Sequence, residues 1–411
     1  MIWHAASRQS PHPGMTTDKR GTPSPLPHYL HAAFMAHAQV IHQRTSLPWT
    51  LDNDIFAREL DPSPRDVVET SSKRIAKMLE GIEAWQNSPS APQPPQRKTI
   101  WQHGPVRLLD LGGTGVRTLV IPSLINRSTI LDLSEDISFV GQLQSGGLSP
   151  VLLDWGTPDA MTRALDLGDL VSQVLIPALH FLHGQSGGPI SVLGYCMGGT
   201  LALGLSARAP SIVARLALIG APWDFSDLRG VSLQLRGQIA QHGIANVRTY
   251  IRQIGHIFGA VPGDLFQYLF AMLAPMQGVQ KFSRFPNLVP GSAHYRHFCA
   301  VEEWVNDSVP VSAPATEDLL INMYCENATA TGKWQINGQP VHLSQLSCPT
   351  LTLAGARDHI VPARLSPETA QLPEGSRSKC FDAGHVGMVA GRAHADVAYR
   401  VCEFLGQKNI S

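Results

Sequence analysis

The sequence lacks a net charge, because its 32 basic side chains balance its 32 acidic ones. Without a global field of either sign, charge favours neither nucleic acid nor an anionic membrane surface as a partner. No apolar run reaches the roughly 20 residues of a transmembrane helix, and the first twenty residues lack the apolar stretch of a signal peptide. We therefore expect a protein with no nucleic-acid partner and no transmembrane segment.

Cysteine is also scarce, and its six positions form neither a C-x-x-C pair nor a set with zinc-ligand spacing. This pattern predicts a reducing, cytoplasmic location, no metal and no other bound cofactor. Repeats of 20 to 50 residues are absent as well, which excludes a solenoid.

The N-terminal part differs in composition from the rest of the chain. Residues 1–26 are rich in Pro, Ser, Thr, Gly and His, which predicts disorder, and Met15 is a second candidate start. Residues 27–98 are expected to form a helical extension followed by a Pro-rich linker. Its helices are predicted over residues 29–43 and 63–85.

From residue 99 to residue 411, strands alternate with helices, which predicts a mostly parallel, doubly wound sheet covered on both faces. The predicted strands are residues 106–111, 117–121, 129–133, 151–154, 189–193, 213–219, 350–354 and 379–381. The expected helices between and after them are residues 166–183, 200–209 and 394–405.

One segment, of about 223–347, interrupts this alternation. It is long, helix-leaning and rich in aromatic residues and methionine, so we expect a helical cap inserted over the sheet's C-terminal edge. Such a cap would form an apolar acyl pocket, whereas the plainer alternative is additional core. The residues considered for the pocket are Phe266, Tyr268, Phe270, Met272, Met276, Phe282 and Phe285.

A Gly-Tyr-Cys-Met-Gly-Gly motif at residues 194–199 joins a β-prone run to a helical one. It is a cysteine version of the G-x-S-x-G nucleophile elbow, in which the nucleophile sits on a strained turn and the glycines let strand and helix pass closely. The helix N-terminus beneath Cys196 favours a thiolate. A buried cysteine in a Gly-rich turn is the alternative interpretation of the motif alone.

Two more candidates follow later strands, Asp358 and then His385. The order of nucleophile, acid and histidine is that of α/β-hydrolase triads. In this chemistry, His385 takes the proton of Cys196 and later returns it, while Asp358 holds the imidazole tautomer. Asp154 and Asp307 compete as acids, but one follows too early a strand and the other lies in the expected cap.

The tetrahedral oxyanion of acyl transfer needs two backbone N–H donors. One is expected from Met197, the residue after the nucleophile, and the other from the loop after an earlier strand. Residues 121–126 form that loop, and Ile125 is the predicted donor.

Taken together, these motifs resemble the polyhydroxyalkanoate synthases, acyltransferases of the α/β-hydrolase fold that polymerise 3-hydroxyacyl-CoA. The similarity runs from about residue 100 to the end of the chain. It covers the cysteine motif at 194–199, upstream motifs at 124–133 and 154–158, the acid motif at 358–362 and Gly384-His385. The resemblance implies that Cys196 carries the growing chain and that Asp358 also activates the incoming hydroxyl. It further implies 3-hydroxyacyl-CoA and the polyester chain as partners, a place at polyester granules, and a homodimer as one assembly state.

The chain also departs from the family pattern, which keeps two other functions open. Ala363 replaces the usual Trp after the acid motif, residues 386–391 differ after the histidine, and residues 303–307 replace a cap motif. The second hypothesis is a cysteine hydrolase, either an esterase, a thioesterase or a polymer-mobilising enzyme, in which water is the acyl acceptor. The third is a non-catalytic granule or synthase-partner subunit, whose N-terminal helices would bind the partner.

Overall fold

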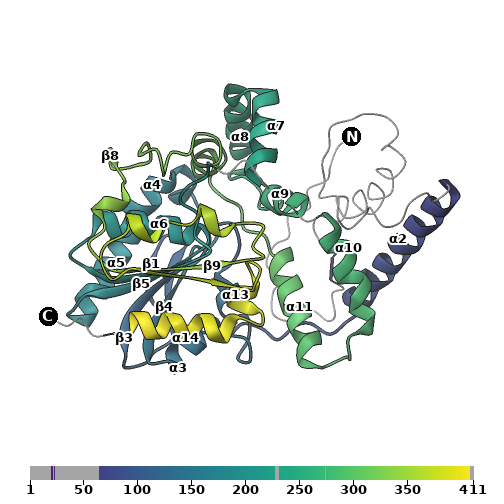
Figure 1. The fold of residues 1–411 in the computed structure, drawn as a ribbon, viewed down its shortest axis with the longest axis horizontal. Helices are drawn as coiled ribbons and strands as arrows, with labels where there is room; N and C mark the ends of the chain where they lie inside the picture. The colour runs from purple at the N-terminus through teal and green to yellow at the C-terminus, as the bar shows by residue number, and fades with distance from the viewer. Residues whose placement is uncertain (1–19, 22, 24–63, 227–230, 274, 408–411) are drawn as a thin grey trace. The chain divides into compact units, whose positions relative to one another are not determined.

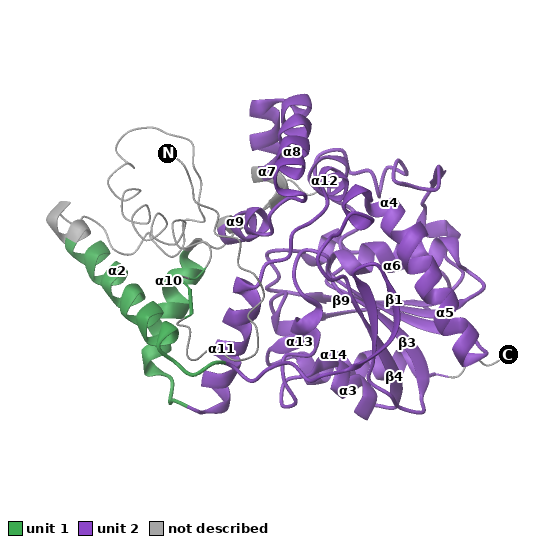
Figure 2. Ribbon diagram, turned by 180° about the vertical axis from the view of Figure 1, so that it is seen from behind, with its two compact units in different colours: residues 1–90, 276–290 green, residues 91–275, 291–411 purple. Residues whose placement is uncertain are grey.

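The computed structural model describes residues 20, 21, 23, 64–226, 231–273 and 275–407 of the 411-residue chain (Figure 1). They fall into two compact units, one of residues 1–90 and 276–290 and the other of residues 91–275 and 291–411 (Figure 2). The helix expected over residues 29–43 and most of the N-terminal segment expected to be disordered lie outside the described residues.

An eight-stranded sheet forms the centre of the larger unit, in the order β1-β2-β4-β3-β5-β6-β9-β10. The strands from β4 to β10 in this order run parallel, while β1 and β2 form an antiparallel edge. The prediction of a mostly parallel sheet is therefore confirmed. The bounds are β1 Lys98–His103, β2 Val106–Asp110, β3 Val116–Ile121, β4 Leu148–Asp154, β5 Ile190–Tyr195, β6 Val213–Ile219, β9 Thr350–Gly355 and β10 Arg377–Phe381.

Helices cover both faces of this sheet, with α3, α13 and α14 on one face and α4, α5 and α6 on the other (Figure 1). Because both faces are covered, every residue of β5 is buried, as expected for a central parallel strand. The helices are α3 Phe139–Ser145, α4 Leu167–Asp169, the π-helix η3 Leu170–Leu175, α5 Ile176–Ser186, α6 Met197–Arg208, α13 Gly387–Ala390 and α14 His394–Leu405. Short 3-10 turns are η1 Ser128–Leu131, η2 Thr162–Ala164, η6 Leu343–Gln345, η7 Ala363–Leu365 and η8 Thr369–Gln371.

One expected strand is absent, and one strand is present that was not expected. Residues 129–133, read as a strand, instead lie in the buried 3-10 turn η1 and the loop after it, where the Asp132 N–H donates to the Thr129 carbonyl. Strand β1 was not predicted, because this edge strand alternates only weakly between buried and exposed positions.

A helical insert is present, as expected, and it lies between β6 and β9. Its elements in the larger unit, here called the cap, are α7 Val231–His242, α8 Ile244–Phe258, α9 Asp264–Leu273, α11 Ala293–Asn306, α12 Ala313–Glu317 and the π-helix η5 Asp318–Met323. None of the described helices combines the length and the apolar character needed to cross a membrane.

The smaller unit packs the helix α2 Pro64–Gln86 against the insert's α10 Pro275–Arg284 and η4 Phe285–Asn287. Trp85 meets Phe282 edge to face, with ring centroids 5.8 Å apart. A Cβ atom at Gly81 would lie 1.8 Å from the Phe282 carbonyl oxygen, so only glycine permits this approach. The N-terminal helix is thus buried against a segment of its own chain.

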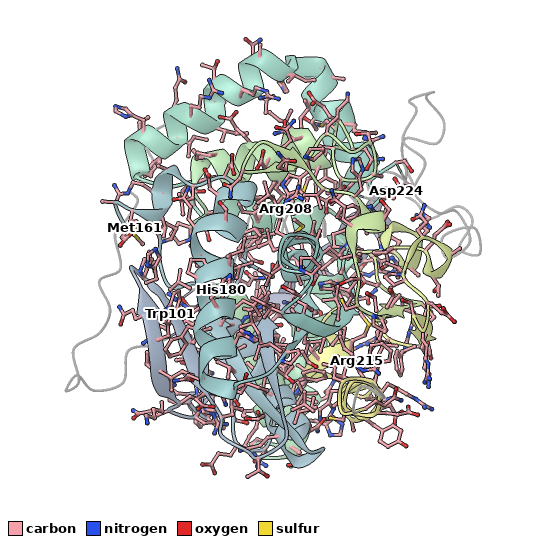
Figure 3. The ribbon with its side chains drawn as sticks, turned by 90° about the vertical axis from the view of Figure 1, so that its left-hand side faces the viewer. Trp101, Met161, His180, Arg208, Arg215 and Asp224 are labelled. Carbon is pink, nitrogen blue, oxygen red and sulfur yellow. The ribbon has the colours of Figure 1, made fainter. Side chains whose placement is uncertain are left out.

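The hairpin of β7 Gln335–Ile336 and β8 Gln339–Pro340 closes the far end of α6. Arg208, the last residue of α6, donates from Nη2 to the carbonyls of Gln339 and Pro340 at 2.5 and 2.7 Å (labelled in Figure 3). This contact joins the C-terminal end of α6 to the β7–β8 hairpin, while the N-terminal end of α6 faces the carboxyl edge of the sheet.

Candidate active site

Cys196 stands at the turn between β5 and α6, with φ 56° and ψ −131°. A positive φ is uncommon for a residue with a side chain and stores strain that the surrounding structure must hold. Glycines make the turn possible, because a Cβ atom at Gly194 would lie 2.4 Å from the Gly199 Cα. The local geometry is that of a nucleophile elbow, with the cysteine presented at the carboxyl edge of the sheet.

Gly198 lets α6 approach the loop after β3, and its replacement by alanine should damage the site. The added Cβ would lie 2.2 Å from the Ile121 carbonyl oxygen and 2.4 Å from that of Pro122. The backbone must shift to make room for the added Cβ atom. This shift should lower the free energy of unfolding by about 1–3 kcal/mol, measured by denaturant titration. The matched control is Gly184→Ala in α5, where an added Cβ atom would meet no neighbouring atom within 4 Å. There the free energy of unfolding should rise by about 0.5–1 kcal/mol, because alanine favours the helix more than glycine does. Equal effects of the two variants would contradict this role for Gly198.

Asp358 and His385 follow β9 and β10, and they meet at the same edge. His385 Nδ1 lies 2.6 Å from Asp358 Oδ2, and both side chains are buried. Asp358 Oδ1 accepts from the backbone N–H groups of Ile360 and Val361 at 2.9 and 2.8 Å. With one oxygen held by the backbone, the other is directed at the imidazole.

Neighbouring groups fix the plane of the His385 ring. Tyr195 stacks on it with centroids 5.0 Å apart and an interplanar angle of 28°. On another side lies Gly220, with φ +53°, where a Cβ atom would be 3.0 Å from His385 Cε1. The Nε2 atom is buried and has no hydrogen-bond partner among the described residues.

Electrostatics favour the imidazolium form of His385. Burial lowers its pKa, but the Asp358 carboxylate and the Cys196 sulfur more than offset burial and raise the pKa to about 10. Burial raises the pKa of Tyr195 well above 10, and the same two groups add to this effect, so the stacked phenol stays neutral. An imidazole whose pKa is raised by a neighbouring carboxylate and sulfur is suited to proton transfer.

The two expected oxyanion donors lie beside Cys196, on the wall of one pocket. Met197 is the first residue of α6, and its N–H makes no hydrogen bond to a described residue, as is usual in a first helical turn. The Ile125 N–H donates to Ser123 Oγ at 3.3 Å, a long contact. The structure therefore brings together Cys196, Met197 and Ile125.

The competing acids have other partners. Asp154 pairs with Arg107 at 2.6 Å, and Asp307 pairs with Arg127 at 2.6 Å. Among the described residues, no group of three His, Cys, Asp or Glu side chains is arranged to hold a metal ion.

The pocket beside Cys196 is apolar and narrow, with a cavity volume of about 20 Å³. This space suits about one water molecule. Of the residues considered for an acyl pocket, Phe266 and Phe270 line it. The residues that line this pocket do not include Tyr268, which is 46% exposed, or Met276, Phe282 and Phe285, which belong to the smaller unit. The Met272 side chain lies outside the described part.

Sequence reasoning missed several residues of this wall, namely Pro222, Leu235, Leu269, Leu319, Leu320, Tyr324, Ile360 and Val361. Tyr324 is the one with a polar group, and burial raises its pKa well above the usual range of a phenol, with added effects of Cys196 and Asp358. Its ring meets that of Phe225 edge to face, with centroids 4.9 Å apart, and its carbonyl accepts from Arg236 Nε at 2.6 Å.

Residues 183–391 match the model of a protein family described as alpha/beta hydrolase fold. Over 299 residues the chain is 31% identical to the poly(3-hydroxyalkanoate) polymerase subunit PhaC of Synechocystis sp., covering 71% of this chain and 78% of the relative. The PhaC subunit of Haloferax mediterranei is 29% identical over 299 residues, covering 72% of this chain. The chain spans 59% of the length of that relative.

Among solved structures, a carboxylesterase of Nitrososphaera gargenis matches with a TM-score of 0.46 and 14% identity. The match covers 75% of this chain and 98% of that one.

Proposed function

The chain belongs to the PhaC family of poly(3-hydroxyalkanoate) polymerases, with the α/β-hydrolase fold, and on this premise we propose that it transfers 3-hydroxyacyl groups from CoA through an acyl-cysteine at Cys196. The observation that carries the proposal is a cysteine at the elbow, beside a buried His–Asp pair and an apolar pocket. CoA is a substrate here, and no bound cofactor takes part.

Acylation follows from the positions of the three side chains. Cys196 Sγ attacks the thioester carbonyl, and the proton of the thiol resides on His385. The Met197 and Ile125 N–H groups would stabilise the oxyanion. When the C–S bond to CoA breaks, His385 returns the proton to the leaving thiolate, so free CoA departs and the acyl group stays on Cys196.

Chain growth needs a hydroxyl in place of water at the second step. His385 accepts the proton of the 3-hydroxyl group of a second 3-hydroxyacyl-CoA, whose oxygen attacks the acyl-cysteine, and the proton then passes to the cysteine sulfur. The freed Cys196 thiol attacks the thioester of the lengthened chain, which releases CoA and returns the chain to Cys196. Asp358 supports this step through His385, because its side chain is fully buried and its oxygens already accept from His385, Ile360 and Val361. The resemblance implies that Asp358 activates the hydroxyl directly. The buried position of Asp358 instead favours activation by His385, with Asp358 acting through the imidazole.

The apolar wall favours transfer over hydrolysis. Phe266, Phe270 and Leu319 face Cys196 together with other apolar side chains, and they leave space for about one water. An acyl-CoA group is far larger, so the wall must move before the substrate reaches the sulfur. When an acyl chain fills the widened pocket, it excludes most water from the acyl-cysteine.

The decisive experiment is a short pulse of 3-hydroxybutyryl-CoA followed by mass spectrometry of the Cys196 peptide. A ladder of hydroxyacyl units on that peptide, with insoluble polymer, is the expected result. A single unit or none, with CoA released continuously, would favour the cysteine hydrolase. No acylation with substrates of several chain lengths would refute the proposal and leave the non-catalytic subunit.

The same premise gives the partners and the location. We propose a cytoplasmic enzyme that works at the surface of polyester granules, because an insoluble chain held on Cys196 keeps the protein at the polymer. Pelleted polymer from the pulse experiment should therefore carry the acylated protein, and its absence from the pellet would argue against the granule surface. A homodimer is the proposed assembly state, to be tested by sedimentation.

A further inference from the structure

The loop that carries the Ile125 donor, residues 122–127, is anchored at its N-terminal end by residues that follow β4 and β5. Trp155 Nε1 donates to the Pro122 carbonyl at 3.1 Å. Gly198 of α6 lies so close that a Cβ atom there would be 2.4 Å from the Pro122 carbonyl oxygen. These contacts fix where the loop leaves β3.

The other side of the loop is anchored by the cap. Gln267 Nε2 of α9 donates to Asn126 Oδ1 at 2.7 Å. Asn126 also forms an antiparallel β-bridge with Ser308. The next residue, Arg127, pairs with Asp307 at 2.6 Å, and its carbonyl accepts from Trp304 Nε1 at 2.8 Å. The inserted segment therefore holds the two residues that follow the Ile125 donor.

Helix α9 serves the pocket as well as the loop. Phe266, Leu269 and Phe270 line the pocket beside Cys196, while Gln267 between them is buried and reaches the loop. The start of α9 is tied down, because Ser308 Oγ donates to Asp264 Oδ1 at 2.9 Å. A group that pushes on the pocket wall therefore pushes on the helix that carries Gln267.

We propose that Gln267 is a positioning residue that aims the Ile125 N–H at the oxyanion, and that α9 couples the filling of the acyl pocket to this aim. The inference rests on the proposed acyl transfer at Cys196. Among the described residues, the Ile125 N–H donates to Ser123 Oγ at 3.3 Å, a long contact that leaves its direction weakly fixed. The anchor at Asn126 limits how the preceding peptide can turn, so losing it would leave the donor free to point elsewhere.

The test replaces Gln267 by Met, which keeps the length and apolar packing of the side chain and removes its donor. The readout is the burst of p-nitrophenolate from p-nitrophenyl butyrate, because it reports acylation of Cys196 whatever the later acceptor. Loss of a whole oxyanion donor costs about 10²–10³ in rate, so a misdirected donor should lower the burst rate about tenfold. We expect KM to stay within twofold.

The matched control is Thr316→Val in α12, which removes another buried cap hydrogen bond, from Thr316 Oγ1 to the Ser312 carbonyl. Its burst rate should equal that of wild type. The second test introduces Gln267→Met into a protein that already carries Asn126→Leu and therefore lacks the acceptor of the Gln267 hydrogen bond. In that background Gln267→Met should change the burst rate by less than twofold.

Equal burst rates in the Gln267→Met and Thr316→Val variants would overturn the inference, as would an undiminished effect in the Asn126→Leu background. A wild-type protein that shows the ester burst but takes no acyl group from CoA would instead overturn the proposed function. A wild-type protein without any burst would overturn both.

Discussion

Alanine in place of Cys196 should abolish CoA release and leave the fold intact. Loss of a nucleophile that acts with a histidine and an acid costs on the order of 10⁶ in turnover. Alanine keeps a Cβ atom and accepts the φ of 56° with no more strain than cysteine, so only the sulfur is lost. The measurements are CoA release from 3-hydroxybutyryl-CoA and thermal unfolding of the same preparations.

The matched control for this variant is Cys380→Ala. Cys380 is an exposed free cysteine on the edge strand β10, so its replacement removes a thiol without touching the pocket. Its CoA release should equal that of wild type. If Cys196→Ala kept more than about one hundredth of the wild-type rate, the acyl group would have to be carried elsewhere, since cysteine is the group that forms the covalent intermediate in this scheme.

The meeting of the three candidate residues at one place was predictable because parallel strands bring their carboxyl ends to one edge. Cys196, Asp358 and His385 each follow a strand of that sheet, so their spacing in the chain mattered less than their place after β5, β9 and β10. The Ile125 loop follows β3, which pairs directly with β5. A local pattern was sufficient wherever the sheet itself does the positioning.

Prediction was weaker where the cap does the positioning. The apolar residues of the insert could be recognised, but Phe266 faces Cys196 and Phe282 packs on Trp85 of α2 in the other unit. Gln267 gave no signal, because its hydrogen-bond partner is Asn126, 141 positions away in the chain. Such pairings are set by tertiary packing, which no window of sequence contains.

Local propensity also failed where hydrogen bonds within a turn outweighed it. Thr129 and Ile130 are β-branched and predicted a strand. Asp132 instead stabilises a turn, because its N–H donates to the Thr129 carbonyl. Its carboxylate accepts from Ser138 Oγ at 2.6 Å and from Arg97 Nε at 2.8 Å. A buried acid with these partners fixes the turn regardless of strand preference.

Replacing Asp358 by asparagine should lower turnover by about 10⁴ with little effect on folding, because it traps His385 in the wrong tautomer. The backbone N–H groups of Ile360 and Val361 both need an oxygen acceptor, so the introduced amide must place its carbonyl where Oδ1 of Asp358 is now. The NH₂ group of the amide then faces His385 Nδ1, 2.6 Å from the replaced oxygen. This donor forces Nδ1 to accept, and the ring proton moves to Nε2.

An imidazole with its proton on Nε2 cannot take a proton from Cys196 through that atom. The substitution also removes the carboxylate that raises the pKa of His385, so burial lowers that pKa relative to wild type. We expect the pH profile of acylation to change with the rate, and rate measurements from about pH 5 to 10 check both. Asp382→Asn is the matched control, because Asp382 is 84% exposed in its pair with Arg357 and should leave rate and profile unchanged. An Asp358→Asn variant with the wild-type profile would show that the carboxylate does not set the state of the histidine.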